Sequence, residues 1–69
     1  MPRLPVLRAR EVVSGLERLG FVVVRQKGGH VQMKNGNLLV TVPVHAGTID
    51  QGTLKPILRQ ARMSVEDLS

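Results

Sequence analysis

Two glycine turns divide the middle of this chain into three short segments, and their spacing strongly limits the folds open to it. The first turn is Lys-Gly-Gly at residues 27–29, and the second is Asn-Gly-Asn at residues 35–37. Glycine and asparagine readily adopt the positive φ that tight hairpins need, and Asn-Gly is typical of a type I′ turn. We therefore predict a meander of three antiparallel strands, over residues 21–26, 30–34 and 38–42.

The residues inside these segments also favour strands. Residues 21–24 are four consecutive large apolar residues, and three of them are β-branched, which suits a strand better than a helix. In the middle segment Val31 and Met33 point to one side of the predicted sheet. The opposite side, which we expect to face solvent, carries His30, Gln32 and Lys34.

The two ends of the chain have the spacing of amphipathic helices. Apolar residues recur every three or four positions over about residues 9–19 and 51–61. Gly20 follows the first helix as a stop, and Asp50 precedes the second as an N-cap. Gly15 falls inside the first helix, and we attribute it to close packing against the sheet.

The order helix, three strands, helix predicts an α+β fold with two layers. Each predicted helix has one apolar stripe and the middle strand has one apolar face, so both helices are expected on the same face of the sheet. At 69 residues the chain is long enough for one domain only, which we take as residues 1–69.

The charge balance indicates a polyanionic partner. Ten Lys and Arg residues face five Asp and Glu residues, which gives a formal net charge of +5. Nucleic acid is the first candidate partner, ahead of a membrane surface, because no stretch resembles a basic amphipathic anchor. No apolar run approaches the ~20 residues of a membrane span, and the N-terminus lacks a signal-peptide core, so we expect a cytoplasmic protein.

The inventory of reactive groups is small. The chain has no cysteine, which excludes disulfides and thiolate metal sites, and its acids are too scattered for a two-metal site. It also lacks the glycine patterns of nucleotide cofactor sites, so no cofactor is implied. The groups that exchange protons near neutral pH are His30 and His45. RNA cleavage suits such an inventory, because the substrate supplies its own 2′-hydroxyl nucleophile and the protein need only move protons and hold the phosphate with cations.

Interpretations in which the same residues have no function also stay open at this point. A histidine at the start of a strand is commonly just solvated, and His45 sits in an ordinary loop sequence. Gly28 and Gly29 are what any tight turn needs, and the lysines and arginines nearby are also what a solvated surface carries. Phe21 is the chain's one aromatic residue, so the stacking platform of a single-strand binder is absent from the sequence.

Several segments, in their order and spacing, resemble a known family. They are Leu19-Gly20-Phe21, Arg25-Gln26-Lys27-Gly28-Gly29-His30, Val42-Pro43-Val44-His45, Gly52-Thr53-Leu54, Ile57-Leu58 and Gln60-Ala61. Together they resemble the HicA-type toxins of type II toxin–antitoxin pairs, over nearly the whole chain. The resemblance implies a fold like that of double-stranded-RNA-binding domains, α-β-β-β-α. It also implies ribosome-independent cleavage of mRNA and neutralisation by a HicB-type antitoxin.

The resemblance also implies a catalytic residue. The family's catalytic histidine lies in a Gly-Ser-His motif, which aligns with Gly28, Gly29 and His30, so glycine replaces the serine here. Two other departures are Arg62, where the family often has a glycine that closes the second helix, and Arg8, where a capping serine is common.

We therefore expect a toxin that cleaves mRNA without a metal ion, with His30 as general acid or base. Its expected RNA- or phosphate-binding residues are Lys27, Gly28, Gly29, Arg25, Lys34 and His45. One alternative is a non-catalytic module that binds double-stranded RNA by shape. Another is an inactive toxin that serves mainly as the antitoxin's binding partner.

Overall fold

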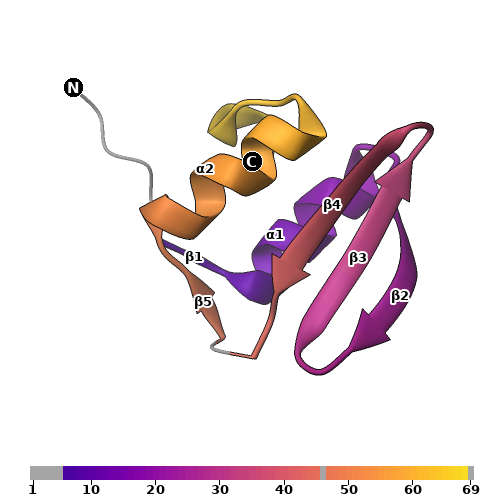
Figure 1. Cartoon of the computed structure of the whole chain (residues 1–69). Helices are drawn as coiled ribbons and strands as arrows, with labels where there is room; N and C mark the ends of the chain where they lie inside the picture. Colours follow the sequence, from indigo (N-terminus) through magenta and orange to yellow (C-terminus); the bar gives the residue numbers. More distant parts are fainter. Residues whose placement is uncertain (1–5, 46, 69) are drawn as a thin grey trace.

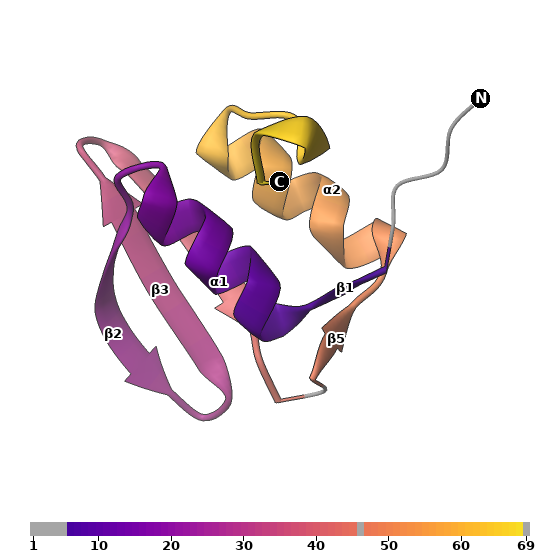
Figure 2. The same ribbon diagram turned by 180° about the vertical axis from the view of Figure 1, so that it is seen from behind.

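The computed structural model describes residues 6–45 and 47–68, and these form an α+β fold of two layers. Figure 1 shows the sheet with α1 behind it, and Figure 2, seen from behind, shows α1 lying across the sheet. The predicted order of helix, three-stranded antiparallel sheet and helix is confirmed. The elements are β1 (Leu7–Arg8), α1 (Ala9–Arg18), β2 (Val22–Lys27), β3 (His30–Asn35), β4 (Leu38–Pro43), β5 (Thr48–Ile49), α2 (Gln51–Ala61) and the 3-10 helix η1 (Val65–Leu68).

The middle strand alternates as its sequence predicts. Val31 pairs with Val42 and Met33 pairs with Val40, and all four side chains are buried on the helix side of the sheet. Gln32 and Lys34, which alternate with Val31 and Met33, point the other way. Gln32 is half-buried and Lys34 is exposed. Since directly opposite residues share a face, this register places one apolar face against the helices along both β3 and β4.

Strand β2, which begins the three-stranded sheet, starts one residue later than predicted. It is also much more exposed than its run of apolar residues suggests. It begins at Val22, so that Phe21, which is buried, precedes it. Val22, Val23 and Val24 are 59%, 43% and 51% exposed. The cause is position, because β2 is an edge strand of the order β2-β3-β4 and its register shifts between Val23 and Arg25. A bulge at an edge turns side chains away from the core.

The two hairpin turns differ in type. Gly28 and Gly29 have φ of +58° and +80°, and two positive values are typical of a type I′ turn. In the second hairpin Asn35 pairs with Leu38, and Gly36 has a φ of +60° whereas Asn37 is not in the positive region. One positive φ at the first central position is the pattern of a type II′ turn, so the type I′ assignment predicted there is wrong.

The helices follow their predicted ranges. Gly20 has a φ of +99° after the end of α1, as its role as a stop requires. At α2 the side chain of Asp50 accepts a hydrogen bond of 2.9 Å from the Thr53 N–H, which confirms the predicted N-cap. The hydrogen bonds from Thr53 lower the pKa of Asp50. Helix α2 ends at Ala61, and its C-cap Arg62 is a non-glycine residue in the left-handed region with φ of 56° and ψ of 47°.

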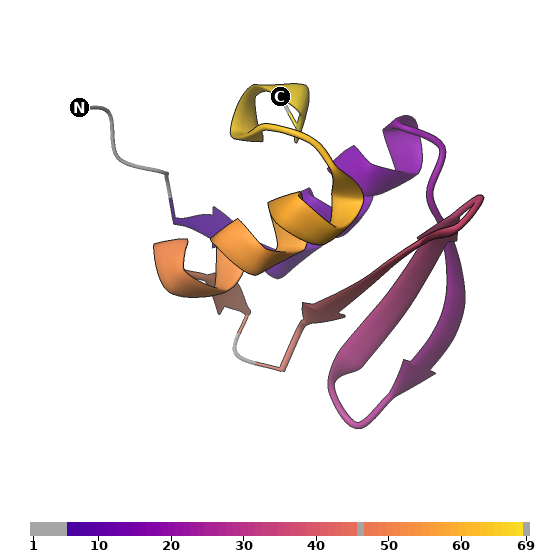
Figure 3. The same ribbon diagram turned by 45° about the horizontal axis from the view of Figure 1, so that its top comes forward.

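Gly15 is buried, but its neighbour is the C-terminal turn and not the sheet. A Cβ atom on Gly15 would lie 3.0 Å from Leu68 Cδ2 and 3.1 Å from the Leu68 carbonyl oxygen. The same carbonyl accepts a 2.6 Å hydrogen bond from the Arg18 guanidinium. The predicted packing of Gly15 against the sheet is therefore wrong, because η1 folds back onto the helical layer (Figure 3).

A two-stranded sheet between β1 and β5 was not predicted. Leu7 pairs with Ile49, which is buried, and the Ala9 N–H donates a 3.0 Å hydrogen bond to the Gly47 carbonyl. Strands of two residues carry too little periodicity to be recognised in a sequence. Their pairing fixes the segment after β4 to the start of α1.

None of the helices in the described part of the chain has the length and apolar character needed to cross a membrane. Residues 1–5, on which the expectation of a missing signal peptide rests, lie outside the described ranges.

Candidate active site at the first hairpin turn

The side of the sheet that faces away from the helices, here called the open face, combines basic, polar and apolar side chains. Directly opposite residues of paired strands share a side of the sheet, so the residues on this side follow from the pairing. They are Val22, Arg25 and Lys27 on β2, His30, Gln32 and Lys34 on β3, and Leu39, Thr41 and Pro43 on β4.

Four of these side chains surround a shallow depression beside the first turn. Lys27 pairs with His30 across the hairpin, and Arg25 pairs with Gln32. Together these four residues line the depression. His30 is exposed, and its Nδ1 lies 3.3 Å from the Gly28 carbonyl oxygen. The fold thus brings the predicted catalytic histidine together with two of the predicted phosphate-binding cations.

Backbone hydrogen bonds hold the second histidine beside the same turn, although it does not line the depression. The Gly29 carbonyl oxygen accepts from the Val44 N–H at 2.7 Å and from the His45 N–H at 3.2 Å. The rings of His30 and His45 have centroids 5.4 Å apart and are tilted by 47°, so they are neighbours without being stacked face to face. Both side chains are exposed to solvent.

Gly29 is required by this arrangement. A Cβ atom at Gly29 would lie 2.6 Å from the Cβ of His45, and the φ of +80° is one that side chains rarely adopt. A serine in this position therefore does not fit unless the loop that carries His45 moves. This contact gives a physical reason for the glycine that stands where the resemblance led us to expect a serine.

Lys34 shares the open face but lies away from the turn. It is four residues further along β3 than His30, a separation of about 13 Å for a strand. Its cross-strand neighbours are Val22 and Leu39, which are 59% and 49% exposed. The open face therefore has a histidine-containing basic end and an opposite end where apolar side chains flank one lysine.

The acidic residues of the chain all lie outside strands β2, β3 and β4. They belong to α1, to the cap of α2 and to η1 and are Glu11, Glu17, Asp50, Glu66 and Asp67. The cations of the open face thus have no carboxylate among the residues of their own sheet. Such a surface attracts anions and raises their local concentration.

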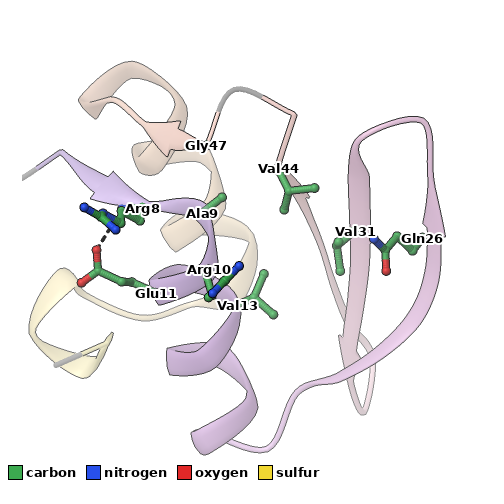
Figure 4. Close-up of a pocket in the computed structure, with 9 residues that line it drawn as sticks. All are labelled: Arg8, Ala9, Arg10, Glu11, Val13, Gln26, Val31, Val44 and Gly47. Carbon is green, nitrogen blue, oxygen red and sulfur yellow. Dashed lines mark hydrogen bonds between the residues drawn. The ribbon is translucent and has the colours of Figure 1, made fainter.

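A larger groove lies on the helix side of the sheet, between the start of α1 and the end of the sheet next to the first hairpin turn (Figure 4). Val13, Val31 and Val44 contribute apolar surface to it, and Arg10 and Gln26 contribute polar groups. Four separate elements meet here, which is why sequence reasoning missed the groove. It adjoins the loop that carries His45, because the residue before His45 lines it.

A comparison with protein families finds a match for most of this chain. The sequence matches the family described as the HicA toxin of bacterial toxin–antitoxin systems over residues 9–63. That stretch begins with α1, contains the whole three-stranded sheet and both histidines, and ends just beyond α2. No curated protein is similar enough to the chain to be matched with it. Because the family match covers more than half of the chain, the protein belongs to the HicA toxin family of bacterial toxin–antitoxin systems.

Proposed function

We propose that this chain is a toxin that cleaves mRNA without a metal ion, with His30 transferring a proton in the cleavage step. The observation that carries the proposal is the surroundings of His30. Its exposed ring stands beside a tight turn, opposite Lys27, and shares a depression with Arg25. Family membership supports the choice of RNA as substrate, because HicA toxins cleave mRNA.

The proposed reaction needs little from the protein. The 2′-hydroxyl of the substrate attacks the adjacent phosphorus, and His30 moves a proton to or from a reacting oxygen. Negative charge builds up on the non-bridging oxygens of the phosphorane, where Lys27 and Arg25 stabilise it. Gly28 and Gly29 add no side chains, and a Cβ on Gly28 would meet nothing within 4 Å, so the phosphate can approach the turn closely.

Charge is proposed to supply most of the RNA affinity. The net charge of +5 and the cations of the open face favour phosphate contacts, which position RNA without reading its sequence. Lys34 and His45 extend the proposed contact surface in two directions from the turn. Since mRNA is the proposed target, the proposed place of action is the bacterial cytoplasm.

The proposed protein partner is a HicB-type antitoxin that covers the open face. Family membership places the chain in a toxin–antitoxin system, which supports the existence of such a partner. The exposed Val22 and Leu39 on either side of Lys34 offer apolar area next to a positive charge. An antitoxin with apolar and acidic groups is complementary to this surface, and its binding would exclude RNA from the turn.

The proposal is tested by incubating the purified chain with RNA in the presence of a chelator. We expect cleavage to continue, with products that end in a 2′,3′-cyclic phosphate and a 5′-hydroxyl. If the chain binds RNA but never cuts it, the proposal is wrong and the chain is the non-catalytic module that binds double-stranded RNA by shape. Cleavage that stops with chelator and returns with added Mg²⁺ would contradict the metal-independent mechanism. A chain that neither binds nor cuts RNA but binds its antitoxin would be an inactive toxin.

A further inference from the structure

We infer that His45 is a second catalytic residue, which protonates the leaving oxygen while His30 removes the proton from the nucleophile. The inference rests on the proposed function, since it divides the proton transfers of that cleavage step between two residues. It stands on the 5.4 Å separation of the two ring centroids and on the backbone contacts that hold His45 at the turn.

Cleavage of a phosphodiester by its own 2′-hydroxyl needs two proton transfers at two different oxygens. One proton leaves O2′ as it attacks, and another must reach O5′ as the bond from phosphorus to O5′ breaks. In an in-line displacement these oxygens lie on opposite sides of the phosphorus. A proton-transferring nitrogen must come within about 2.6–3.2 Å of its oxygen, so one imidazole on one side cannot serve both.

The two rings are arranged to flank one phosphate. They come from different segments, β3 and the loop after β4, and their planes are tilted by 47° and not stacked. Each side chain is exposed, so a phosphate can enter from solvent. Lys27, directly across the hairpin from His30, then faces the same phosphate group.

The contact of His30 with Gly28 favours His30 as the base. Its Nδ1 lies 3.3 Å from the Gly28 carbonyl oxygen, which can only accept a hydrogen bond. In the neutral ring, a proton on Nδ1 leaves Nε2 with the lone pair that a base needs. His45, in its protonated form, is then the acid.

The balanced step follows from this assignment. Neutral His30 takes the O2′ proton, the bond between O2′ and phosphorus forms, and the bond between phosphorus and O5′ breaks with its electron pair going to O5′. Protonated His45 gives its proton to O5′. The products are a 2′,3′-cyclic phosphate and a 5′-hydroxyl, and exchange with water returns both histidines to their starting protonation states.

Several contacts with Gly29 fix the backbone position of His45. Its carbonyl accepts two backbone N–H groups, from Val44 and His45. Its missing side chain leaves the space that the Cβ of His45 fills, at 2.6 Å from where a Gly29 Cβ would be. One further pairing, between His30 and Pro43, ends β4 just before this loop. These contacts hold the backbone of His45 against the first turn.

The test compares two RNA substrates that differ in one atom. One has the natural O5′ at the cleavage site, and the other has sulfur in that bridging position. A thiolate leaves without a proton, so the sulfur substrate does not need the acid. We expect His45→Ala to slow cleavage of the natural substrate by about 10²–10⁴-fold, the usual contribution of a general acid, and to cleave the sulfur substrate at nearly the parent rate. His30→Ala should be slow on both substrates.

The conservative variant His45→Asn separates proton donation from hydrogen bonding. Its amide can still donate a hydrogen bond but cannot release a proton, so we expect it to behave like His45→Ala. The parent chain should give a bell-shaped pH profile on the natural substrate. A general acid acts only in its protonated form, so we expect both His45 variants to lose the alkaline limb of this profile. Melting temperature and RNA affinity of each variant verify that fold and binding are retained.

Three results would overturn the inference. His45→Ala could cleave the natural substrate as fast as the parent, which would leave His30 as the only histidine involved. It could also be slowed equally on both substrates, which would make His45 a positioning residue. In the third case His45→Asn would restore the rate, so that a hydrogen bond suffices. Each of these leaves the proposed function standing, whereas a parent chain that cleaves neither substrate would refute the proposed function itself.

Discussion

Gly29 and His45 fit together so closely that a Cβ atom on Gly29 would lie 2.6 Å from the Cβ of His45. The Gly29 carbonyl also accepts the His45 N–H at 3.2 Å. One glycine thus forms the hairpin turn, leaves room for the neighbouring loop and anchors it. The distance between the two histidine rings depends on this residue.

Replacing Gly29 with serine, the residue of the family's motif, should therefore be harmful. The matched control is Gly28→Ser, which has a similarly positive φ of +58° but would place its Cβ in open space. Each substitution carries the left-handed backbone cost of about 1–2 kcal/mol, and Gly29→Ser adds the clash with His45. We expect urea unfolding to show the larger loss of stability for Gly29→Ser. Equal effects at the two positions would contradict the role of this contact.

Arg62→Gly should stabilise the chain. Arg62 closes α2 with φ of 56° and ψ of 47°, a conformation that glycine adopts without the penalty of a side chain. We expect a gain in the free energy of unfolding of about 1 kcal/mol, with cleavage unchanged. The control, Arg59→Gly, removes the same charge from inside α2 and should lose about 1 kcal/mol. If both variants lost stability in thermal or urea unfolding, the backbone argument would be wrong.

Salt should reveal which lysines contact phosphate. Lys27→Ala and Lys34→Ala should each make the slope of log affinity against log salt concentration less steep by about one unit. Lys55 is exposed on α2, outside the open face, so Lys55→Ala should leave the slope unchanged. The measurement is an RNA titration at several salt concentrations. A slope that responds to Lys55 and not to Lys27 would place the RNA on another surface.

Leu39→Ser should lower the affinity for the antitoxin by a larger factor than it lowers the rate of RNA cleavage. Leu39 is 49% exposed and pairs with Lys34 at the end of the open face away from the histidines. We expect antitoxin affinity to fall by about tenfold, which corresponds to an interface contact worth about 1.4 kcal/mol. Val6, which is 64% exposed but lies outside the sheet, supplies the control Val6→Ser. The measurement is a calorimetric titration with the antitoxin. If both variants bind it as tightly as the parent does, the open face is not the interface.

The fold was largely predictable because its signals are local. The alternation of Val31 and Met33, the cap at Asp50 and the stop at Gly20 each depend on a few neighbouring residues. The failures are non-local. Gly15 packs against Leu68 from the other end of the chain, and the pairing of β1 with β5 joins segments far apart in sequence.

The site was predictable only in part for the same reason. The hairpin alone brings Lys27 next to His30, so spacing was enough to group them. The closeness of His45 depends on hydrogen bonds between the first turn and the loop after β4, which no sequence period encodes. The exposure of Val22 likewise follows from its place on the open face of the edge strand β2, and not from its own apolar character.

The central claim is that His30 moves a proton in the cleavage of RNA, and the most direct test is the cleavage rate of His30→Ala. The side chain is exposed on the open face, so its loss opens no cavity, and the neighbouring cations remain to bind RNA. Melting temperature and RNA affinity should therefore stay close to those of the parent, while the cleavage rate falls by about 10²–10⁴-fold. A stable, RNA-binding His30→Ala that cleaves as fast as the parent would contradict the account.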